Sequence, residues 1–140
     1  MAAITSWEKA ILFVRAALEK KAWDLVLLQV RELTSIADYF IVCSGRSDRQ
    51  VQSIAQGIEE TASKAGIRPI SVEGVTRGHW VLMDFSDVIV HIFYEPTRAF
   101  YDLDGLWDAA PRVKLPEAYS TLVSQFQITS KRVSQNSTDL

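Results

Sequence analysis

The chain has 140 residues, of which 48% are hydrophobic and 23% charged, enough for one globular domain and hardly enough for two. The formal net charge of −2 and the pI of about 5.7 argue against direct nucleic-acid binding, because domains that bind phosphate backbones usually present a basic face. The single cysteine, Cys43, excludes an intrachain disulfide, and no apolar run approaches the roughly 20 residues that span a bilayer. We therefore expect a cytoplasmic protein without membrane attachment.

The N-terminal part of the chain predicts a helix followed by two strands. Thr5 and Glu8 have the spacing of a capping box, and apolar residues then recur at helical spacing over residues 6–21. The apolar run LVLLQV at 25–30 is typical of a buried strand. A second strand is predicted at 39–43 (YFIVC), which is rich in aromatic and branched residues.

The next part of the chain predicts a second helix and then a hairpin. Ser47 and Gln50 form another capping pattern, and the helix that they open should end before Gly66. Ser86 and Asp87 separate two apolar runs by the spacing of a tight hairpin. The remaining predicted elements are, in chain order, strands at 70–75, 80–85 and 88–94 and a last helix from Pro96 to about residue 106.

This order of elements predicts an α/β fold with a mixed β-sheet of about five strands flanked by helices. A single domain should occupy residues 1–110. Residues 111–140 contain Pro111 and Pro116 and then turn polar, so we expect a flexible C-terminal extension.

Few residues of the chain are suited to catalysis or metal binding. Gly45 lies where a strand turns into a helix, but no phosphate-loop motif surrounds it, which favours a simple turn glycine. His79 and His91 are the two histidines, and zinc-ligand spacing is absent. Cys43 and His91 could lie on neighbouring strands. The chain has no basic residue close to Cys43 until Arg46, however, so nothing nearby is expected to lower the pKa of the thiol. We predict a buried, inert thiol and neither a metal nor a cofactor.

Asp84 and Asp87 are the acidic pair that a magnesium-dependent enzyme could use. Nucleotidyl transfer with two metal ions needs carboxylates on one face of a strand, which means a spacing of two residues. Here the spacing is three and crosses a turn, so the pair is better explained by a strand end and a turn residue. A small nucleotidyltransferase-like enzyme using these acids with magnesium stays open as the alternative function.

The strand at 80–85 presents two different faces because side chains alternate along a strand. One face carries Trp80, Leu82 and Asp84, and the other carries Val81, Met83 and Phe85. One set should enter the core. The Trp80 set has the composition of an interface anchor with a charged rim, unless both faces of the sheet are covered.

Two long segments of the chain resemble the Iojap family, the ribosomal silencing factors. The first is SIADYFIVCSGRSDRQVQSIAQGIEE at 35–60, and the second is GHWVLMDFSDVIVHIFYEPTRAFYDLDGLW at 78–107. With the strand DLVLLQVREL at 24–33, the resemblance covers residues 6–107. These motifs are long and keep their order, which makes the resemblance specific.

The resemblance implies a fold like that of nucleotidyltransferases, without an assigned catalytic role. It also implies binding to the large ribosomal subunit through protein number fourteen of that subunit, at the intersubunit face. A factor bound there would prevent the small subunit from joining and so lower translation when nutrients are scarce. Some members of the family form homodimers.

The same resemblance places a set of residues at or near the ribosomal contact. They are Trp80, Leu82, Asp84, Asp87, Arg98 and Tyr101. One departure concerns an acidic pair that family members commonly carry before the position of Arg98. Here Glu95 is followed by Pro96, which removes one charge from this part of the predicted contact.

Overall fold

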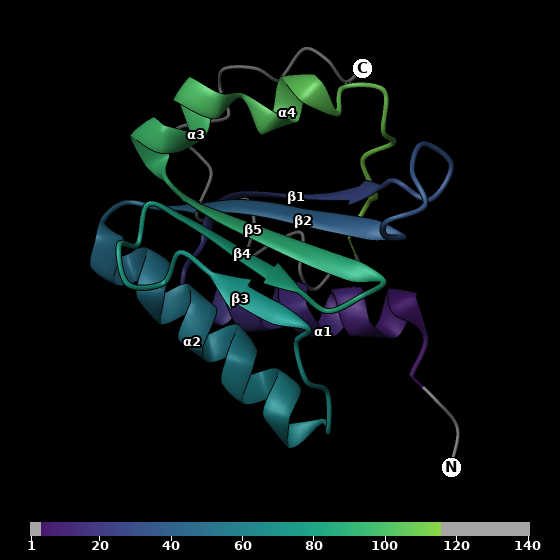
Figure 1. The fold of residues 1–140 in the computed structure, drawn as a ribbon, viewed down its shortest axis with the longest axis horizontal. Coiled ribbons are helices and arrows are strands. Elements are labelled where there is room, and N and C mark those ends of the chain that lie inside the picture. Colours follow the sequence, from purple (N-terminus) through teal and green to yellow (C-terminus); the bar gives the residue numbers. More distant parts are fainter. Residues whose placement is uncertain (1–3, 116–140) are drawn as a thin grey trace.

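The computed structural model describes residues 4–115, which form an α/β fold in three layers (Figure 1). The predicted order of helices and strands is confirmed, except that the last helix is divided in two. In chain order, the elements are α1 (Ser6–Glu19), β1 (Trp23–Gln29), β2 (Tyr39–Gly45), α2 (Asp48–Lys64), β3 (Ser71–Glu73), β4 (Trp80–Asp84), β5 (Val88–Tyr94), α3 (Glu95–Tyr101) and α4 (Leu103–Leu106).

A five-stranded sheet forms the middle layer, with the strand order β1-β2-β5-β4-β3. β2 and β5 are parallel, whereas the other neighbouring pairs are antiparallel. The expected mixed sheet of about five strands is therefore confirmed. Because β5 inserts between β2 and β4, the two segments that carry most of the sequence motifs lie side by side.

The two long helices begin at their predicted caps. At α1, the Thr5 hydroxyl accepts a hydrogen bond from the Glu8 N–H and the Glu8 carboxylate accepts one from the Thr5 N–H, both at 3.0 Å. This confirms the predicted capping box. At α2, Ser47 Oγ accepts from the Gln50 N–H, but the Gln50 side chain accepts from the N–H of Arg46 and not from that of Ser47.

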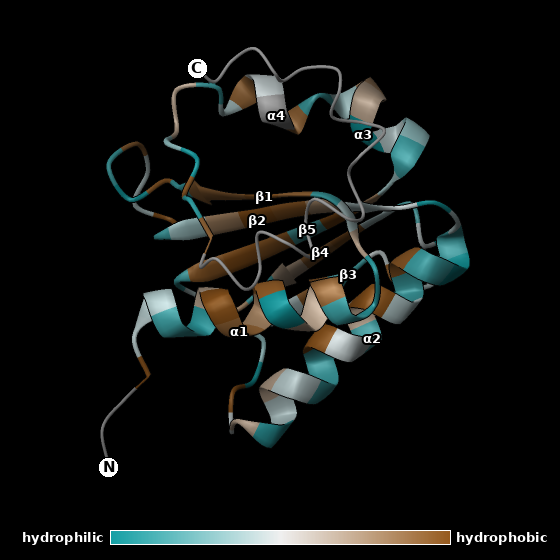
Figure 2. Cartoon of the chain, turned by 180° about the vertical axis from the view of Figure 1, so that it is seen from behind, coloured by the Kyte–Doolittle hydropathy of each residue, from teal (hydrophilic) through white to brown (hydrophobic). Residues whose placement is uncertain are grey.

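α1 and α2 cover one face of the sheet and enclose the larger core. In Figure 2 the strands are mostly brown (hydrophobic), whereas the two helices alternate between brown and teal, as amphipathic helices do. Phe13 of α1 and Phe85, which follows β4, pack together in this core with ring centroids 4.3 Å apart. This face of the sheet is closed to solvent by apolar packing.

α3 and α4 lie over the opposite face of the sheet (Figure 1), where Leu103 and Trp107 pack against strand residues. The prediction of one continuous helix from Pro96 to about residue 106 is wrong at Asp102. Its φ of 49° is left-handed and ends α3. The Asp102 side chain then caps α4 by accepting a hydrogen bond from the Gly105 N–H at 3.2 Å. A short polar side chain that tolerates this conformation explains the break.

The predicted hairpin between β4 and β5 is confirmed. Ser86 and Asp87 form its two-residue loop, across which the Phe85 N–H donates to the Val88 carbonyl at 3.0 Å. Ser86 has a φ of 81°, a positive value typical of tight hairpin turns. Asp84 Oδ1 accepts a hydrogen bond from the Ser86 N–H at 2.9 Å and so stabilises a turn that contains no glycine.

After α4 the chain returns to the outer edge of β1. The Gln29 N–H donates to the Pro111 carbonyl at 2.9 Å, and the Val113 N–H donates to the Leu27 carbonyl at 2.8 Å. This pairing covers an edge strand that would otherwise present unpaired backbone groups. Residues 116–140, most of the predicted extension, lie outside the described residues, so its flexibility stays a prediction.

Candidate functional site

β4 sends alternate side chains to the two faces of the sheet, as predicted. Val81 and Met83 are fully buried under α1 and α2, whereas Trp80 and Leu82 are half-buried on the face of α3 and α4. The sequence left open whether this second face is covered. The structure shows that it is covered in part, because α3 and α4 leave Trp80 partly accessible to solvent.

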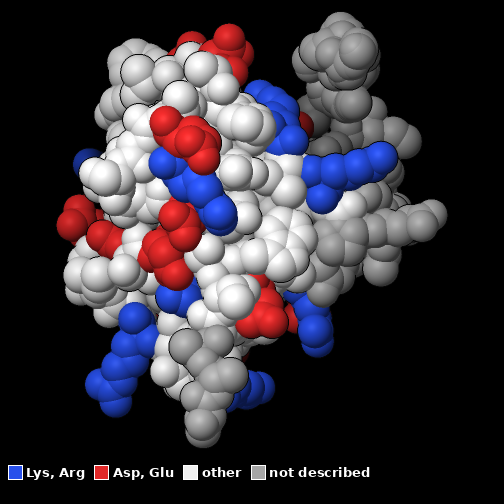
Figure 3. All heavy atoms as spheres, turned by 90° about the vertical axis from the view of Figure 1, so that its right-hand side faces the viewer, with Lys and Arg blue, Asp and Glu red and all other residues white. Residues whose placement is uncertain are grey.

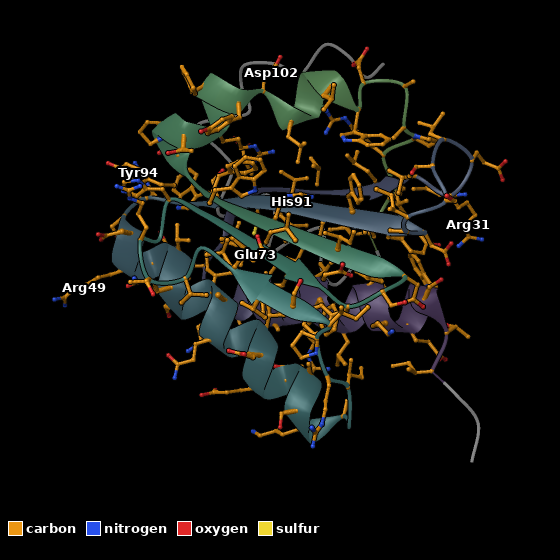
Figure 4. The ribbon with its side chains drawn as sticks, viewed as in Figure 1. Arg31, Arg49, Glu73, His91, Tyr94 and Asp102 are labelled. Carbon is orange, nitrogen blue, oxygen red and sulfur yellow. The ribbon has the colours of Figure 1, made fainter. Side chains whose placement is uncertain are left out.

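Trp80 belongs to an aromatic cluster built from β4, β5 and α3. Its indole stacks on Phe93, with ring centroids 4.9 Å and ring planes 28° apart. On α3, the ring of Tyr101 lies at the same centroid distance of 4.9 Å from Trp80. The indole Nε1–H donates a hydrogen bond to Nδ1 of His91 at 3.2 Å. Figure 4 shows His91 on the sheet beneath α3 and α4.

A shallow groove of about 450 Å³, here called the Trp80 groove, opens beside this cluster. Its walls come from the loop before β4 and from α3. Phe100 and Tyr101 line it, although 80% and 53% of their respective surfaces are exposed. Exposed aromatic rings around a concave surface are typical of a binding site, because a solvated ring gains stability only when a partner covers it.

The rim of the Trp80 groove carries polar and basic side chains, and an acidic residue precedes its first lining residue, Gly74, in the chain. Arg77 lines the groove and forms no ion pair within residues 4–115. His79 stacks on Tyr94, with ring centroids 5.4 Å apart. Glu73 is exposed on β3, opposite Leu82 in the strand register (Figure 4). The groove therefore combines an aromatic floor with a mixed polar rim, as protein–protein contacts commonly do.

The two acids of the hairpin make different contacts. Asp84 lies opposite Ile89 in the register and supports the turn through the Ser86 N–H. Asp87 instead forms an ion pair with Lys9 of α1, with 2.7 Å between Lys9 Nζ and Asp87 Oδ1. Each carboxylate is thus engaged locally, so the enzymatic alternative gains no support from their geometry. Within the described residues, no group of three or more His, Cys, Asp or Glu could hold a metal ion.

Arg98 and Tyr101 both belong to α3, but only Tyr101 lines the groove. Arg98 Nη1 donates to the Asp24 carbonyl at 2.7 Å and to Ser44 Oγ at 2.9 Å. Asp24 has a φ of 48° and lies at an irregularity in the β1–β2 register. Arg98 therefore ties α3 to β1 and β2, and its predicted contact with a partner stays a prediction.

Cys43 and His91 lie on neighbouring strands but on opposite faces of the sheet. The register pairs Val42 with His91 and Cys43 with Ile92, and Cys43 is fully buried under α1 and α2. Burial raises the pKa of its thiol from 9.0 to about 12, an effect that the positive charge of Arg98 partly offsets. The predicted burial of the thiol is confirmed, the conceivable Cys–His pair does not form, and the inertness of the thiol stays a prediction.

Gly45 allows the end of β2 to approach α2 closely. A Cβ atom at this position would lie 2.9 Å from the backbone nitrogen of Val51, closer than such atoms can pack. The glycine therefore has a steric role at the turn into the helix, as the sequence indicated.

Two residues around the site, Phe100 and Arg77, escaped sequence reasoning, as did the pairing of His91 with Trp80. The hairpin contained a signal for the pairing, because a turn at Ser86 and Asp87 places residue 82 opposite His91 and residue 80 one step diagonally away. Phe100 could not be placed in this way, because the break in the helix decides which side chains of α3 face solvent.

The charge on one side of the molecule does not indicate a nucleic-acid interface there. Figure 3 shows the side of the molecule that lies to the right in Figure 1, where acidic and basic side chains are interspersed among uncharged ones. A phosphate-binding surface would instead show a continuous basic patch. No helix in the described part of the chain combines the length and the apolar character that crossing a membrane requires.

Fold and site together define a single-domain α/β protein with a partly covered aromatic surface on one face of its sheet. The family described as "Ribosomal silencing factor during starvation" matches residues 3–139, and the chain belongs to this family. The sequence is 41% identical to the ribosomal silencing factor of Bacillus subtilis, over 77% of this chain and 93% of that protein. It is 35% identical to the chloroplastic Iojap protein of Zea mays, over 76% of this chain and 46% of that protein.

Solved structures show the same fold. A crystal structure of a Bacillus halodurans protein matches with a TM-score of 0.67 and 39% identity, over 74% of this chain and 94% of that one. One from Chromobacterium violaceum matches with a TM-score of 0.73 and 32% identity, over 81% of this chain and 92% of that one. The family supports ribosome-associated repression of translation, and the names of the relatives describe regulators rather than enzymes.

Proposed function

We propose that the protein represses translation by binding the large ribosomal subunit at its intersubunit face, where it sterically blocks joining of the small subunit. The contact in this proposal is with protein number fourteen of the large subunit, and the Trp80 groove is the surface that meets it. The protein acts in the cytoplasm and uses no cofactor. Membership in the ribosomal silencing family supports the ribosome as the target.

The observation that carries the proposal is the state of Trp80. Its indole contacts the rings of Phe93 and Tyr101 and is only half-buried. A tryptophan held in this way loses little conformational freedom when a partner covers it, so more of the contact energy appears as affinity. Tryptophan is also enriched among the residues that dominate protein interfaces.

The net charge of the whole chain, −2, suits a basic partner, although Arg77, which lines the groove, is itself basic. Glu73 and Asp102, both exposed, are the chain neighbours of the groove residues Gly74 and Tyr101 (Figure 4). Complementary charge accelerates the encounter and sets its orientation more than it raises affinity. The association rate should therefore fall as the salt concentration rises, while the aromatic contact keeps most of its strength.

A subunit-joining assay with purified ribosomal subunits tests the proposal. The protein should lower the fraction of joined ribosomes and should co-sediment with large subunits. Trp80→Ala should weaken binding by roughly 2 kcal/mol or more, which corresponds to about thirtyfold in the dissociation constant. Trp80→Ala should also lose most of the inhibition at a concentration where the unmodified protein is saturating.

Trp7→Ala is the matched control, because Trp7 is 37% exposed on α1, on the other side of the sheet. It should bind and inhibit like the unmodified protein. Large subunits that ignore the protein would refute the proposal. Equal loss in both tryptophan variants would refute the Trp80 groove as the contact surface.

Self-association is a separate proposal that the same surface supports. Phe100 and Leu106 are 80% and 74% exposed, so a second copy could cover them. A homodimer that hides the Trp80 groove would compete with the ribosome and form an inactive reserve. Light scattering at rising protein concentration, with and without large subunits, tests this; a dimer that still binds large subunits fully would contradict the competition.

A further inference from the structure

We infer that His91 is a positioning residue for the Trp80 groove: from beneath the surface, it holds the Trp80 indole in the orientation that shapes the groove. The effect on ribosome binding rests on the proposed function. The orientation of the indole does not, because it can be measured on the free protein.

The hydrogen bond between the two rings defines the state of both. His91 is buried, with 6% of its surface exposed, and its Nδ1 lies 3.2 Å from the Trp80 Nε1. An indole N–H can only donate, so Nδ1 of His91 must be an unprotonated acceptor. A neutral imidazole in this position carries its proton on Nε2. The bond thus selects one tautomer of His91 and one edge of the indole.

His91 is itself held rigidly by its neighbours. Phe40 of β2 meets it edge-on, with ring centroids 5.3 Å and planes 70° apart. Phe93 lies nearly parallel to it, at 6.3 Å and 10°. An acceptor fixed by packing can orient a donor, because it does not move to follow the donor.

Ring stacking alone would not define the orientation of Trp80. Phe93 stacks on the indole with an interplanar angle of 28°, and the ring of Tyr101 lies against it tilted by 44°. An indole turned over about its side-chain axis would keep much of this stacking. It would, however, carry the N–H away from Nδ1 of His91 and present another edge to the groove. Stacking stabilises the two orientations of the indole almost equally. The hydrogen bond to His91 therefore decides which orientation the indole adopts.

Substitutions at both positions test the inference. His91→Phe keeps a ring in the core and removes the acceptor, whereas His91→Asn places an amide oxygen near the position of Nδ1. The Trp80 indole resonance in a ¹H–¹⁵N spectrum should shift in His91→Phe and stay close to its original position in His91→Asn. Nitrogen chemical shifts of the unmodified protein should show His91 as the neutral tautomer with the proton on Nε2.

Binding to large subunits supplies the second readout. His91→Phe should weaken binding about five- to tenfold, the effect of losing one buried hydrogen bond, and His91→Asn should restore most of it. Trp80→Phe removes the donor and keeps a ring, so adding His91→Phe to it should change binding no further. Cys43→Ala controls for general loss of core packing, because Cys43 is fully buried on the opposite face. It should leave the indole resonance and binding unchanged.

Three results would overturn the inference: an unshifted indole resonance in His91→Phe, equal loss of binding in His91→Phe and His91→Asn, or additive effects in the double variant. If His91→Phe does not fold, His91→Asn decides the question. A shifted indole resonance together with weak binding to large subunits in His91→Asn would also overturn the inference. If the unmodified protein does not bind large subunits while His91→Phe still shifts the indole resonance, the proposed function fails and the positioning role stands.

Discussion

The face of the sheet under α1 and α2 differs from the face under α3 and α4 in both cover and chemistry. The first is closed by a large cluster of buried residues, almost all of them apolar. The second has a smaller cluster and leaves Trp80 and Leu82 half-buried. Among the residues whose burial the structure describes, the two buried polar side chains, Ser44 and His91, both lie on this second face.

Each of these polar residues contacts a residue of the candidate site. Ser44 accepts a hydrogen bond from Arg98, which ties α3 to the sheet, and His91 accepts one from Trp80. The free energy gained by burying apolar side chains is roughly proportional to the buried area and does not depend on direction. A buried hydrogen bond, in contrast, requires one particular geometry of its donor and acceptor. The face under α1 and α2 therefore supplies most of the folding energy. The face under α3 and α4 defines the shape of the candidate binding surface.

The largest expected effect is on the closed face. Phe13→Ala removes a fully buried ring that packs on Phe85 and should lower the free energy of unfolding by about 3–5 kcal/mol. Urea denaturation measures it. Phe100→Ala, the same substitution at an 80% exposed position of α3, should cost less than about 0.5 kcal/mol. Similar losses in both variants would break the comparison.

Arg98→Met should have an intermediate effect on stability. It leaves the Asp24 carbonyl and the Ser44 hydroxyl without their donor, and we expect a loss of about 1–3 kcal/mol. Hydrogen exchange should accelerate in α3 more than in α1, because α3 loses its tie to the sheet. The control is Arg15→Met, which removes an exposed ion pair with Glu19 and should be nearly neutral. Uniform acceleration over the whole chain would argue against a local tie.

The buried Cys43 thiol should make the folded protein less stable as the solution becomes alkaline. The folded pKa of about 12 lies above the ordinary thiol pKa of 9.0, so the unfolded thiol ionises first and the folded state binds more protons. Stability from this group is complete below pH 9 and is lost as pH rises toward 12, by at most about 1.4 kcal/mol per pH unit. Denaturation at pH ~8, ~9.5 and ~10.5 compares the protein with Cys43→Ala. Parallel pH profiles in the two proteins would contradict the raised pKa.

The smallest expected effect on stability comes with a measurable effect on binding. Phe100→Ala should leave unfolding almost unchanged and weaken binding to large subunits by about 1 kcal/mol, because the exposed ring meets the partner only in the complex. Co-sedimentation at several concentrations measures it. Ile70→Ala, at a 69% exposed position just before β3, is the control and should bind normally. Loss of binding in Ile70→Ala as well would place the contact elsewhere.

Much of the local structure was predictable because its causes are local. Thr5 and Glu8 define the start of α1, and Ser86 and Asp87 define the hairpin, since capping and turn formation involve residues close in the chain. The break at Asp102 was not predictable from helical periodicity, because a left-handed residue does not change the spacing of apolar residues. Arg98 was predicted at the contact, yet its hydrogen bonds to β1 and β2 link residues more than fifty positions apart.

By itself, the sequence determined the class of fold, the family and the division of β4 into a core face and a Trp80 face. These follow from periodicity, from local turn and cap chemistry and from long ordered motifs. Tertiary structure alone decided that β5 lies between β2 and β4, that His91 meets Trp80 while Cys43 faces the other way, and that α3 leaves Phe100 exposed. The physical reason is that these contacts join distant segments, so their geometry depends on how the whole sheet and its helices pack.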